Sequence, residues 1–143
     1  MRLFSQNVKV EALGRAPLFE GLSRKELTEL ARVTDDLALE PGTVLCREGK
    51  IGREFFVLVD GSVDVIQGGK RIATLGGGDF IGEIALLTDT RRTATVKATT
   101  PLRCFVLTAA DFRRVMDENR GVERKVMRAL AERLLSYAED AAV

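Results

Sequence analysis

Histidine is absent from this sequence of 143 residues, and cysteine occurs only twice, as Cys46 and Cys104. The familiar zinc-binding spacings of cysteine and histidine therefore cannot be assembled, which argues against metal catalysis. Both cysteines lie in apolar, strand-like runs, where a small buried thiol is more common than a disulfide. We expect free thiols, a reducing compartment, and neither a metal nor a cofactor.

Long apolar runs and an excess of charge are also missing. No run approaches the roughly 20 apolar residues that cross a bilayer, and the N-terminus lacks the apolar core of a signal peptide. The 22 basic and 21 acidic residues leave a formal net charge of +1. Binding to nucleic acid or to an anionic membrane normally requires a much stronger positive charge. We expect a soluble, cytoplasmic single domain with a small-molecule partner.

Helix signals occur at both ends of the chain. Ser23 and Glu26 have the spacing of a capping box, and apolar residues at near-helical intervals then predict a helix over about 23–33. Thr108 and Asp111 form a second, weaker capping box, and we expect Gly121 to separate the helix that follows from the last one. The last helix has an apolar seam with steps of three or four residues: Met127, Leu130, Leu134, Tyr137 and Ala141.

Between these ends the chain has the pattern of β structure. Short runs rich in valine, isoleucine, leucine and phenylalanine are separated by glycines, which is the turn spacing of an antiparallel β-roll. Apolar and polar residues alternate most clearly over 62–66 and 103–107, so one side chain in two is expected to face inward there. One helix-like interruption, over 82–87, falls inside this region.

The segment 78–96 has the composition of an anion pocket. The short helix opens on Gly82, so the free N–H groups of its first turn favour a bound phosphate. Arg92 adds a full charge, because a guanidinium pairs with phosphate through two parallel hydrogen bonds and keeps its proton. Glu83 only accepts hydrogen bonds and would repel a phosphate, so its natural partners are sugar hydroxyls. Phosphate and ribose together indicate a nucleotide.

The order and spacing of these residues resemble the phosphate-binding cassette of the cyclic nucleotide-binding domain family. The family pattern runs F-G-E-x-A-L-L, four variable residues, then R-[S/A/T]-A-T-V. This chain has I-G-E-I-A-L-L at 81–87 and R-T-A-T-V at 92–96. The resemblance covers most of residues 13–140, with further matches at 16–22, 48–49, 55–63 and 78–79.

The resemblance implies a mainly β fold with flanking helices. The expected core is an eight-stranded antiparallel β-roll of the double-stranded β-helix or jelly-roll type, with a short internal phosphate-binding helix. Residues 1–143 would form one domain, with an N-terminal helical piece over about 1–34, the roll over about 35–107 and C-terminal helices over about 108–141. A helix-turn-helix has no room after the last helix, so direct DNA binding is not expected.

The resemblance also implies the ligand, a 3′,5′-cyclic purine nucleotide, which would be bound without catalysis. We expect cAMP, with cGMP as the alternative. Arg92 rather than Arg91 would face it, because neighbouring side chains of an extended segment point to opposite faces. A lid would come from Arg133, Leu134 and Tyr137. The remaining contacts would be Gly82, Glu83, Ile84, Ala85, Thr93 and Ala94, with Val65, Ile72 and Ala73 as the apolar wall.

Several of these residues also have a purely structural interpretation. Glu83 would then complement a helix dipole, Thr93 would be an ordinary β-branched strand residue, and Tyr137 would belong to a packed helix face. The last helix either packs on its own roll or pairs with a second chain, and we expect a homodimer. The downstream effector is not identified by the sequence.

Three alternative functions stay open beside cyclic nucleotide sensing. The first is a β-roll interaction module whose nucleotide pocket is degenerate. The second is a regulatory fragment of a larger channel, transporter or enzyme. The third is a cupin-type enzyme, which shares the β-roll architecture but needs a cluster of metal-binding side chains, usually histidines. The absence of histidine argues strongly against the third.

Overall fold

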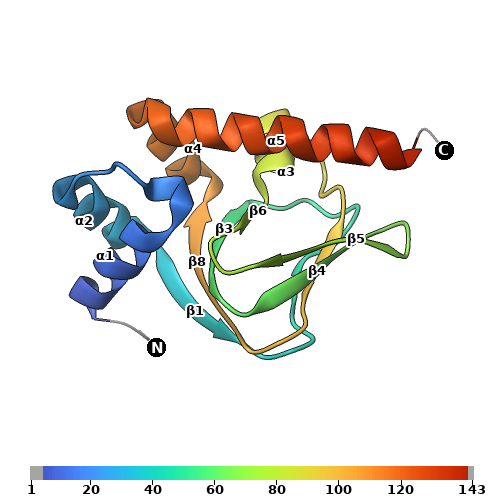
Figure 1. Cartoon of the computed structure of the whole chain (residues 1–143), viewed down its shortest axis with the longest axis horizontal. Helices are drawn as coiled ribbons and strands as arrows, with labels where there is room; N and C mark the ends of the chain where they lie inside the picture. The colour runs from blue at the N-terminus through green and yellow to red at the C-terminus, as the bar shows by residue number, and fades with distance from the viewer. Residues whose placement is uncertain (1–4, 142–143) are drawn as a thin grey trace.

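A computed structural model describes residues 5–141, with side chains up to Ser136, as a β-roll flanked by helices (Figure 1). The helices are α1 (Gln6–Arg15), the 3-10 helix η1 (Pro17–Phe19), α2 (Arg24–Val33), α3 (Glu83–Thr88), α4 (Ala109–Glu118) and α5 (Arg120–Ala141). The strands are β1 (Asp35–Leu39), β2 (Val44–Cys46), β3 (Glu54–Asp60), β4 (Ser62–Gln67), β5 (Lys70–Gly76), β6 (Phe80–Ile81), β7 (Thr95–Ala98) and β8 (Leu102–Thr108).

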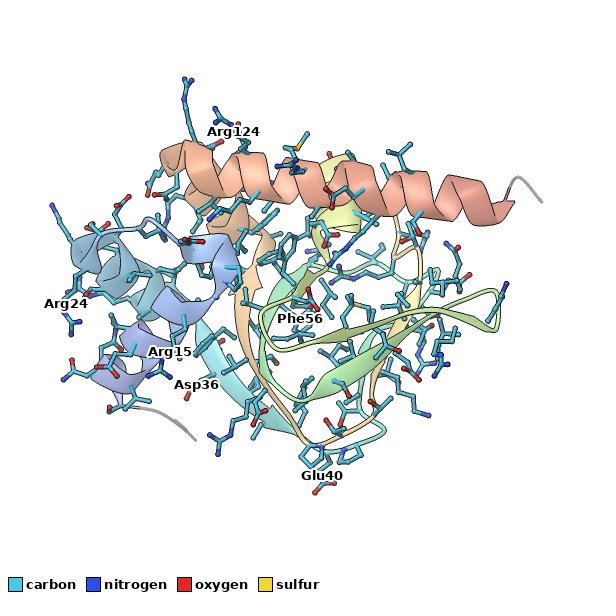
Figure 2. All side chains as sticks on the ribbon, viewed as in Figure 1. Arg15, Arg24, Asp36, Glu40, Phe56 and Arg124 are labelled. Atoms are coloured by element: carbon cyan, nitrogen blue, oxygen red, sulfur yellow. The ribbon has the colours of Figure 1, made fainter. Side chains whose placement is uncertain are left out.

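The eight strands form two four-stranded antiparallel sheets that face each other. Their orders are β1-β8-β3-β6 and β2-β7-β4-β5. Side chains from both sheets meet in one apolar cluster, and Figure 2 shows Phe56 of β3 in the interior of the roll. The eight-stranded β-roll predicted from the sequence is therefore confirmed, with α3 as its internal helix.

The sheet that contains β3 and β8 is buried on both faces. Phe56 and Cys104 pack toward the opposite sheet, whereas their neighbours Phe55 and Phe105 pack into a second cluster with the helices. Over 103–107 one side chain in two therefore faces the opposite sheet, as predicted, but Phe105 and Leu107 on the other face are buried as well, because helices cover the outer face of this sheet. Over 62–66 the alternation holds, with Val63 and Val65 buried.

Both predicted capping boxes lie at the starts of helices. The Ser23 hydroxyl accepts from the N–H of Glu26, whose carboxylate accepts in return from the N–H of Ser23. At α4 the Thr108 hydroxyl accepts from the N–H of Asp111, which is one half of the predicted second capping box. Local hydrogen bonding therefore fixes where the roll meets its helices on each side.

The boundary between α4 and α5 differs from the prediction. It lies at Asn119 rather than at Gly121, which is the second residue of α5. The backbone of Asn119 is extended, and its side-chain Nδ2 donates to the carbonyl of Val115 at 3.0 Å. This bond satisfies one of the carbonyls left free where a helix ends, so α4 stops two residues earlier than the glycine suggested.

Helix α5 runs along one end of the roll and passes over α3 (Figure 1). Val122 and Val126 pack into the helical cluster, and Leu130 is also buried. Met127 and Leu134 of the predicted seam are instead exposed, so the seam divides between the core and the solvent. Tyr137 and Ala141 lie beyond the described side chains. Arg124 extends away from the roll in Figure 2.

Two lysines hold the N-terminal helices in place: Lys9 joins α1 to the end of α2, and Lys125 joins this helical piece to α5. The ammonium of Lys9 is buried and donates to the carbonyl of Thr34, where α2 ends. Lys125 of α5 donates to the carbonyls of Pro17 at 2.8 Å and Glu20 at 3.3 Å. The carbonyls of Thr34 and Glu20 directly follow helices, where backbone acceptors are left free, whereas the carbonyl of Pro17 also accepts from the N–H of Glu20.

Cys46 and Cys104 are both free and buried, in agreement with the prediction of free thiols. Across residues 5–141, no helix is both long enough and apolar enough to cross a bilayer.

We expect the aromatic contacts of Phe55 to dominate the stability of the helical cluster. Its ring stacks on Phe112 at 4.3 Å between centroids and contacts Phe80 at 5.6 Å. Phe55→Ala should lower the free energy of unfolding by about 3–5 kcal/mol, the usual cost of emptying a buried aromatic site. Urea denaturation measures this. Ile51→Ala is the control, because Ile51 is 66% exposed; equal effects of the two variants would contradict the assignment.

Candidate functional site

The site begins where β6 turns into α3. Gly82 occupies this turn with a φ of 100°, in the left-handed region that favours glycine. A Cβ atom there would lie 2.6 Å from the carbonyl oxygen of Glu54, so a side chain is excluded by space as well as by backbone conformation. No side chain caps the start of α3. The turn therefore presents main-chain groups rather than side chains to the space beside it.

Arg92 crosses beneath this turn and is buried, with 6% of its surface exposed. Its Nη1 donates to the carbonyl of Gly82 at 3.1 Å, and its Nη2 donates to the carbonyl of Glu54 at 2.7 Å. The carboxylate of Glu54 is 4.0 Å from Nη2 and about half exposed. A guanidinium with two neutral acceptors and one distant, hydrated carboxylate keeps donors and positive charge available for a bound anion.

Glu83, the first residue of α3, is 1% exposed. Its Oε1 accepts from Nη1 of Arg133 on α5. Its Oε2 is buried and has no hydrogen-bond partner among the residues that the structure describes. A buried acceptor without a donor is unfavourable by about 1–3 kcal/mol. The second oxygen is therefore suited to a donor from a ligand.

Arg133 closes the site from α5. Its Nη2 donates to the carbonyl of Phe80 at 2.6 Å, and its Cζ lies 5.0 Å from the centre of the Phe80 ring. Together with the Glu83 pair, these contacts attach α5 to the strand and the helix that form the edge of the site. The contact is a partly buried one that combines an ion pair, a hydrogen bond and a cation–π interaction.

These groups enclose a cavity of about 130 Å³, which we call the α3 cavity. It brings together all the predicted pocket residues and one predicted lid residue, Arg133. Arg91 is exposed and donates to the carbonyl of Gly49 at 3.2 Å instead. The lining residues are Cys46, Val65, Ile72, Ala73, Leu75, Ile81, Gly82, Glu83, Ile84, Ala85, Arg92, Thr93, Ala94, Val96, Arg133 and Ser136.

The other two predicted lid residues are not part of this lining. Leu134 is 47% exposed and lies outside it. The side chain of Tyr137 lies outside the described residues. Ser136 does line the α3 cavity and was not predicted, although it follows Arg133 by three residues and so shares its helix face.

Four apolar lining residues were also missed by the sequence analysis: Cys46, Leu75, Ile81 and Val96. Val96 pairs with both Cys46 and Val65, so the register of three strands brings these side chains to one wall. Burial raises the pKa of the Cys46 thiol to about 11, which leaves it protonated at neutral pH. Cys46 is therefore part of the apolar wall rather than a nucleophile.

The protein is thus a β-roll with a cavity beside a short helix, and the cavity lining includes a buried arginine and a buried glutamate. The family is then established by comparison: the model of the cyclic nucleotide-binding domain matches residues 37–119, more than half of the chain. The chain therefore belongs to the cyclic nucleotide-binding domain family.

Individual relatives agree with this assignment. The chain is 31% identical over 105 residues to a cAMP-dependent protein kinase regulatory subunit of Schizosaccharomyces pombe, covering 73% of this chain and 26% of that protein. It is 31% identical over 123 residues to a cyclic nucleotide-gated potassium channel of Rhizobium etli, covering 86% and 34%. The fold matches the cAMP-bound structure of PfPKA-R with a TM-score of 0.87 at 24% identity, covering 95% and 47%.

Proposed function

We propose that the α3 cavity binds a 3′,5′-cyclic purine nucleotide, with cAMP as the preferred ligand, and that binding is regulatory rather than catalytic. One observation carries the proposal: Arg92 and Glu83 line the same cavity, and the guanidinium of Arg92 is buried while the Oε2 of Glu83 has no hydrogen-bond partner in the described part of the chain. An anion and a hydroxyl joined in one small molecule would satisfy both groups. A ribose with a cyclic phosphate has this combination.

Each part of the nucleotide has a counterpart in the cavity. The phosphate is assigned to Arg92, Thr93 and the main chain from Gly82 to Ala85. The ribose hydroxyl is assigned to Glu83. The base is assigned to the apolar wall and to the part of α5 that carries Ser136; the wall residues at that end are Val65, Ile72, Ala73 and Leu75.

The chain spans about a quarter to a third of the length of the two curated relatives described above. One of them is a kinase regulatory subunit and the other is a channel. We therefore propose that this domain reports nucleotide occupancy to an effector, which is either part of the same protein or a separate partner.

The route from the cavity to an effector is proposed to run through α5. Glu83 is shared between Arg133 and the expected ribose hydroxyl, so a nucleotide changes the electrostatic environment of the contact that holds α5. If α5 can take two positions and the ligand binds the protein more tightly in one of them, the ligand shifts the population toward that position. The shift equals the difference between the two binding free energies.

The outer face of α5 is proposed as a homodimer contact. Met127 and Leu134 are exposed and seven residues apart, so they lie on one face of the helix, and Leu135 beside them is 66% exposed. Exposed apolar residues that gather on one helix face are typical of a surface that binds another protein. We assign the partner of this face as the same face of α5 in a second copy of the chain. A two-fold pairing of the two helices would cover the exposed apolar residues of both copies.

We predict that Arg92→Ala weakens cAMP binding by about 30-fold to several-thousand-fold, because truncating one partner of a buried charge pair costs about 2–5 kcal/mol. Arg91→Ala is the matched control and should change the affinity little, since Arg91 is exposed. Calorimetric titration of both variants with cAMP and cGMP at one salt concentration measures the effect. Equal losses would contradict the role of Arg92, and a several-fold preference of the wild type for cGMP would contradict the base assignment.

We predict that the 2′-hydroxyl of the ligand is required because of Glu83. The wild type should bind 2′-deoxy-cAMP more weakly than cAMP by about 1–3 kcal/mol, the cost of leaving a buried acceptor unpaired. Glu83→Ala should remove most of this difference. The four affinities form a double-mutant cycle, and a deoxy penalty of full size in Glu83→Ala would show that another residue binds the ribose.

We predict that Leu134→Glu converts a wild-type dimer into a monomer, because it places two like charges in an apolar contact. Sedimentation velocity over a range of concentrations, with and without cAMP, measures this. If α5 links the two sites, cAMP must change the dimer dissociation constant, since coupling between ligands is reciprocal. A monomeric wild type at all concentrations would contradict the dimer. A dimer that is indifferent to cAMP would contradict transmission through this face of α5.

A further inference from the structure

Gly52, in the loop between β2 and β3, leaves open the space that the Arg92 side chain occupies. A Cβ atom on Gly52 would lie 1.8 Å from Nε, 2.2 Å from Cζ and 2.5 Å from Nη2 of Arg92. Non-bonded carbon atoms in favourable contact lie about 3.5–4.0 Å apart, so these three distances are far too short. Even the smallest side chain at position 52 is therefore incompatible with the observed position of the guanidinium.

Position 52 requires a glycine because a side chain would have no space there, and not because the backbone has an unusual conformation. Gly52 is absent from the glycines with positive φ, so its backbone is compatible with an L-residue. Gly82 differs, because its φ of 100° also disfavours a side chain. The three atoms nearest to an added Cβ at position 52 all belong to the end of the Arg92 side chain, which can rotate to another conformer.

The hydrogen-bond acceptors of the guanidinium are main-chain atoms, and the half-exposed carboxylate of Glu54 lies 4.0 Å from its Nη2. Its two acceptors are the carbonyls of Gly82 and Glu54, which any residue type at these positions would supply. Substitutions at Gly82 or Glu54 keep these carbonyl acceptors. The inward conformation of Arg92 is therefore most sensitive to positions where a new side chain would enter the space of the guanidinium. Gly52 is the position at which this intrusion is greatest, since its Cβ would meet three atoms of the guanidinium group.

We propose that Gly52 is a positioning residue that keeps Arg92 in the α3 cavity and thereby maintains the phosphate-binding site. This inference rests on the proposed function of Arg92. With any side chain at position 52, the guanidinium leaves its two carbonyl acceptors and the cavity loses its cation. Arg92 would still be present in the sequence, but the protein would behave as if it had been removed.

Calorimetric titration with cAMP tests the binding consequence in Gly52→Ala, Arg92→Ala and the double variant. Gly52→Ala should lose affinity by at least about 30-fold, as expected for Arg92→Ala. The double variant should lose no more than Arg92→Ala alone, because the two substitutions remove the same interaction. Gly52→Ala with wild-type affinity would overturn the proposal. Losses that add in the double variant would overturn it as well.

Two glycine-to-alanine controls separate this effect from a general disturbance. Gly121→Ala, in the first turn of α5, has nothing within 4 Å of the added Cβ and should leave affinity unchanged. Gly77→Ala would place its Cβ 2.6 Å from the carbonyl oxygen of Val59, so it disturbs the backbone away from Arg92. It should lower the thermal midpoint by the same amount whether Arg92 is present or absent.

Thermal unfolding of the same variants without ligand tests the close contact between position 52 and the Arg92 guanidinium. Gly52→Ala should lower the midpoint in the wild-type background and leave it unchanged or raised in the Arg92→Ala background, where the three atoms nearest to the Cβ are absent. An alanine compatible with the backbone also reduces the entropy of the unfolded chain. If the wild type binds neither cAMP nor cGMP, the proposed function fails while this comparison still decides the role of Gly52. If Gly52→Ala changed the thermal midpoint equally in the wild-type and the Arg92→Ala backgrounds, the proposed role of Gly52 would be overturned.

Discussion

The burial of a positive charge at Arg92 is the constraint around which this domain is organised. A guanidinium taken out of water needs acceptors in place of the lost hydration, and it finds them in the carbonyls of Gly82 and Glu54. These two carbonyls belong to the turn before α3 and to the start of β3, so the position of Arg92 depends on both elements. The left-handed turn at Gly82 is what brings its carbonyl within reach.

The layered arrangement explains how such a site stays in place. The sheet of β3 and β8 is packed on both faces, by the opposite sheet on one side and by helices on the other. Close-packed protein interiors have low compressibility, so they transmit small displacements rather than absorbing them. The α3 cavity therefore has a rigid floor and apolar wall, while its remaining side is formed by a single helix held through Arg133.

Much of this architecture could be predicted from local patterns in the sequence. Capping boxes gave the starts of α2 and α4, glycine spacing gave the roll, and the motif at 81–96 gave the residues that gather around the α3 cavity. What could not be predicted depends on contacts between distant segments. Cys46 and Val96 reach one wall through strand register, Phe105 is buried by helices from elsewhere in the chain, and Asn119 ends α4 through a side-chain bond.

The attachment of α5 by two cations has a mechanical consequence. Lys125 fixes the helix to the carbonyls of Pro17 and Glu20, and Arg133 fixes it to Phe80 and Glu83, eight residues further on. At 1.5 Å per residue these points are about 12 Å apart. Val122 and Val126 anchor the near point in the core. We propose that loss of the Arg133 contacts would let α5 tilt about the point held by Lys125. The displacement would then increase with distance from Lys125 along α5, so a tilt too small to disturb the core would move the residues after Arg133 further.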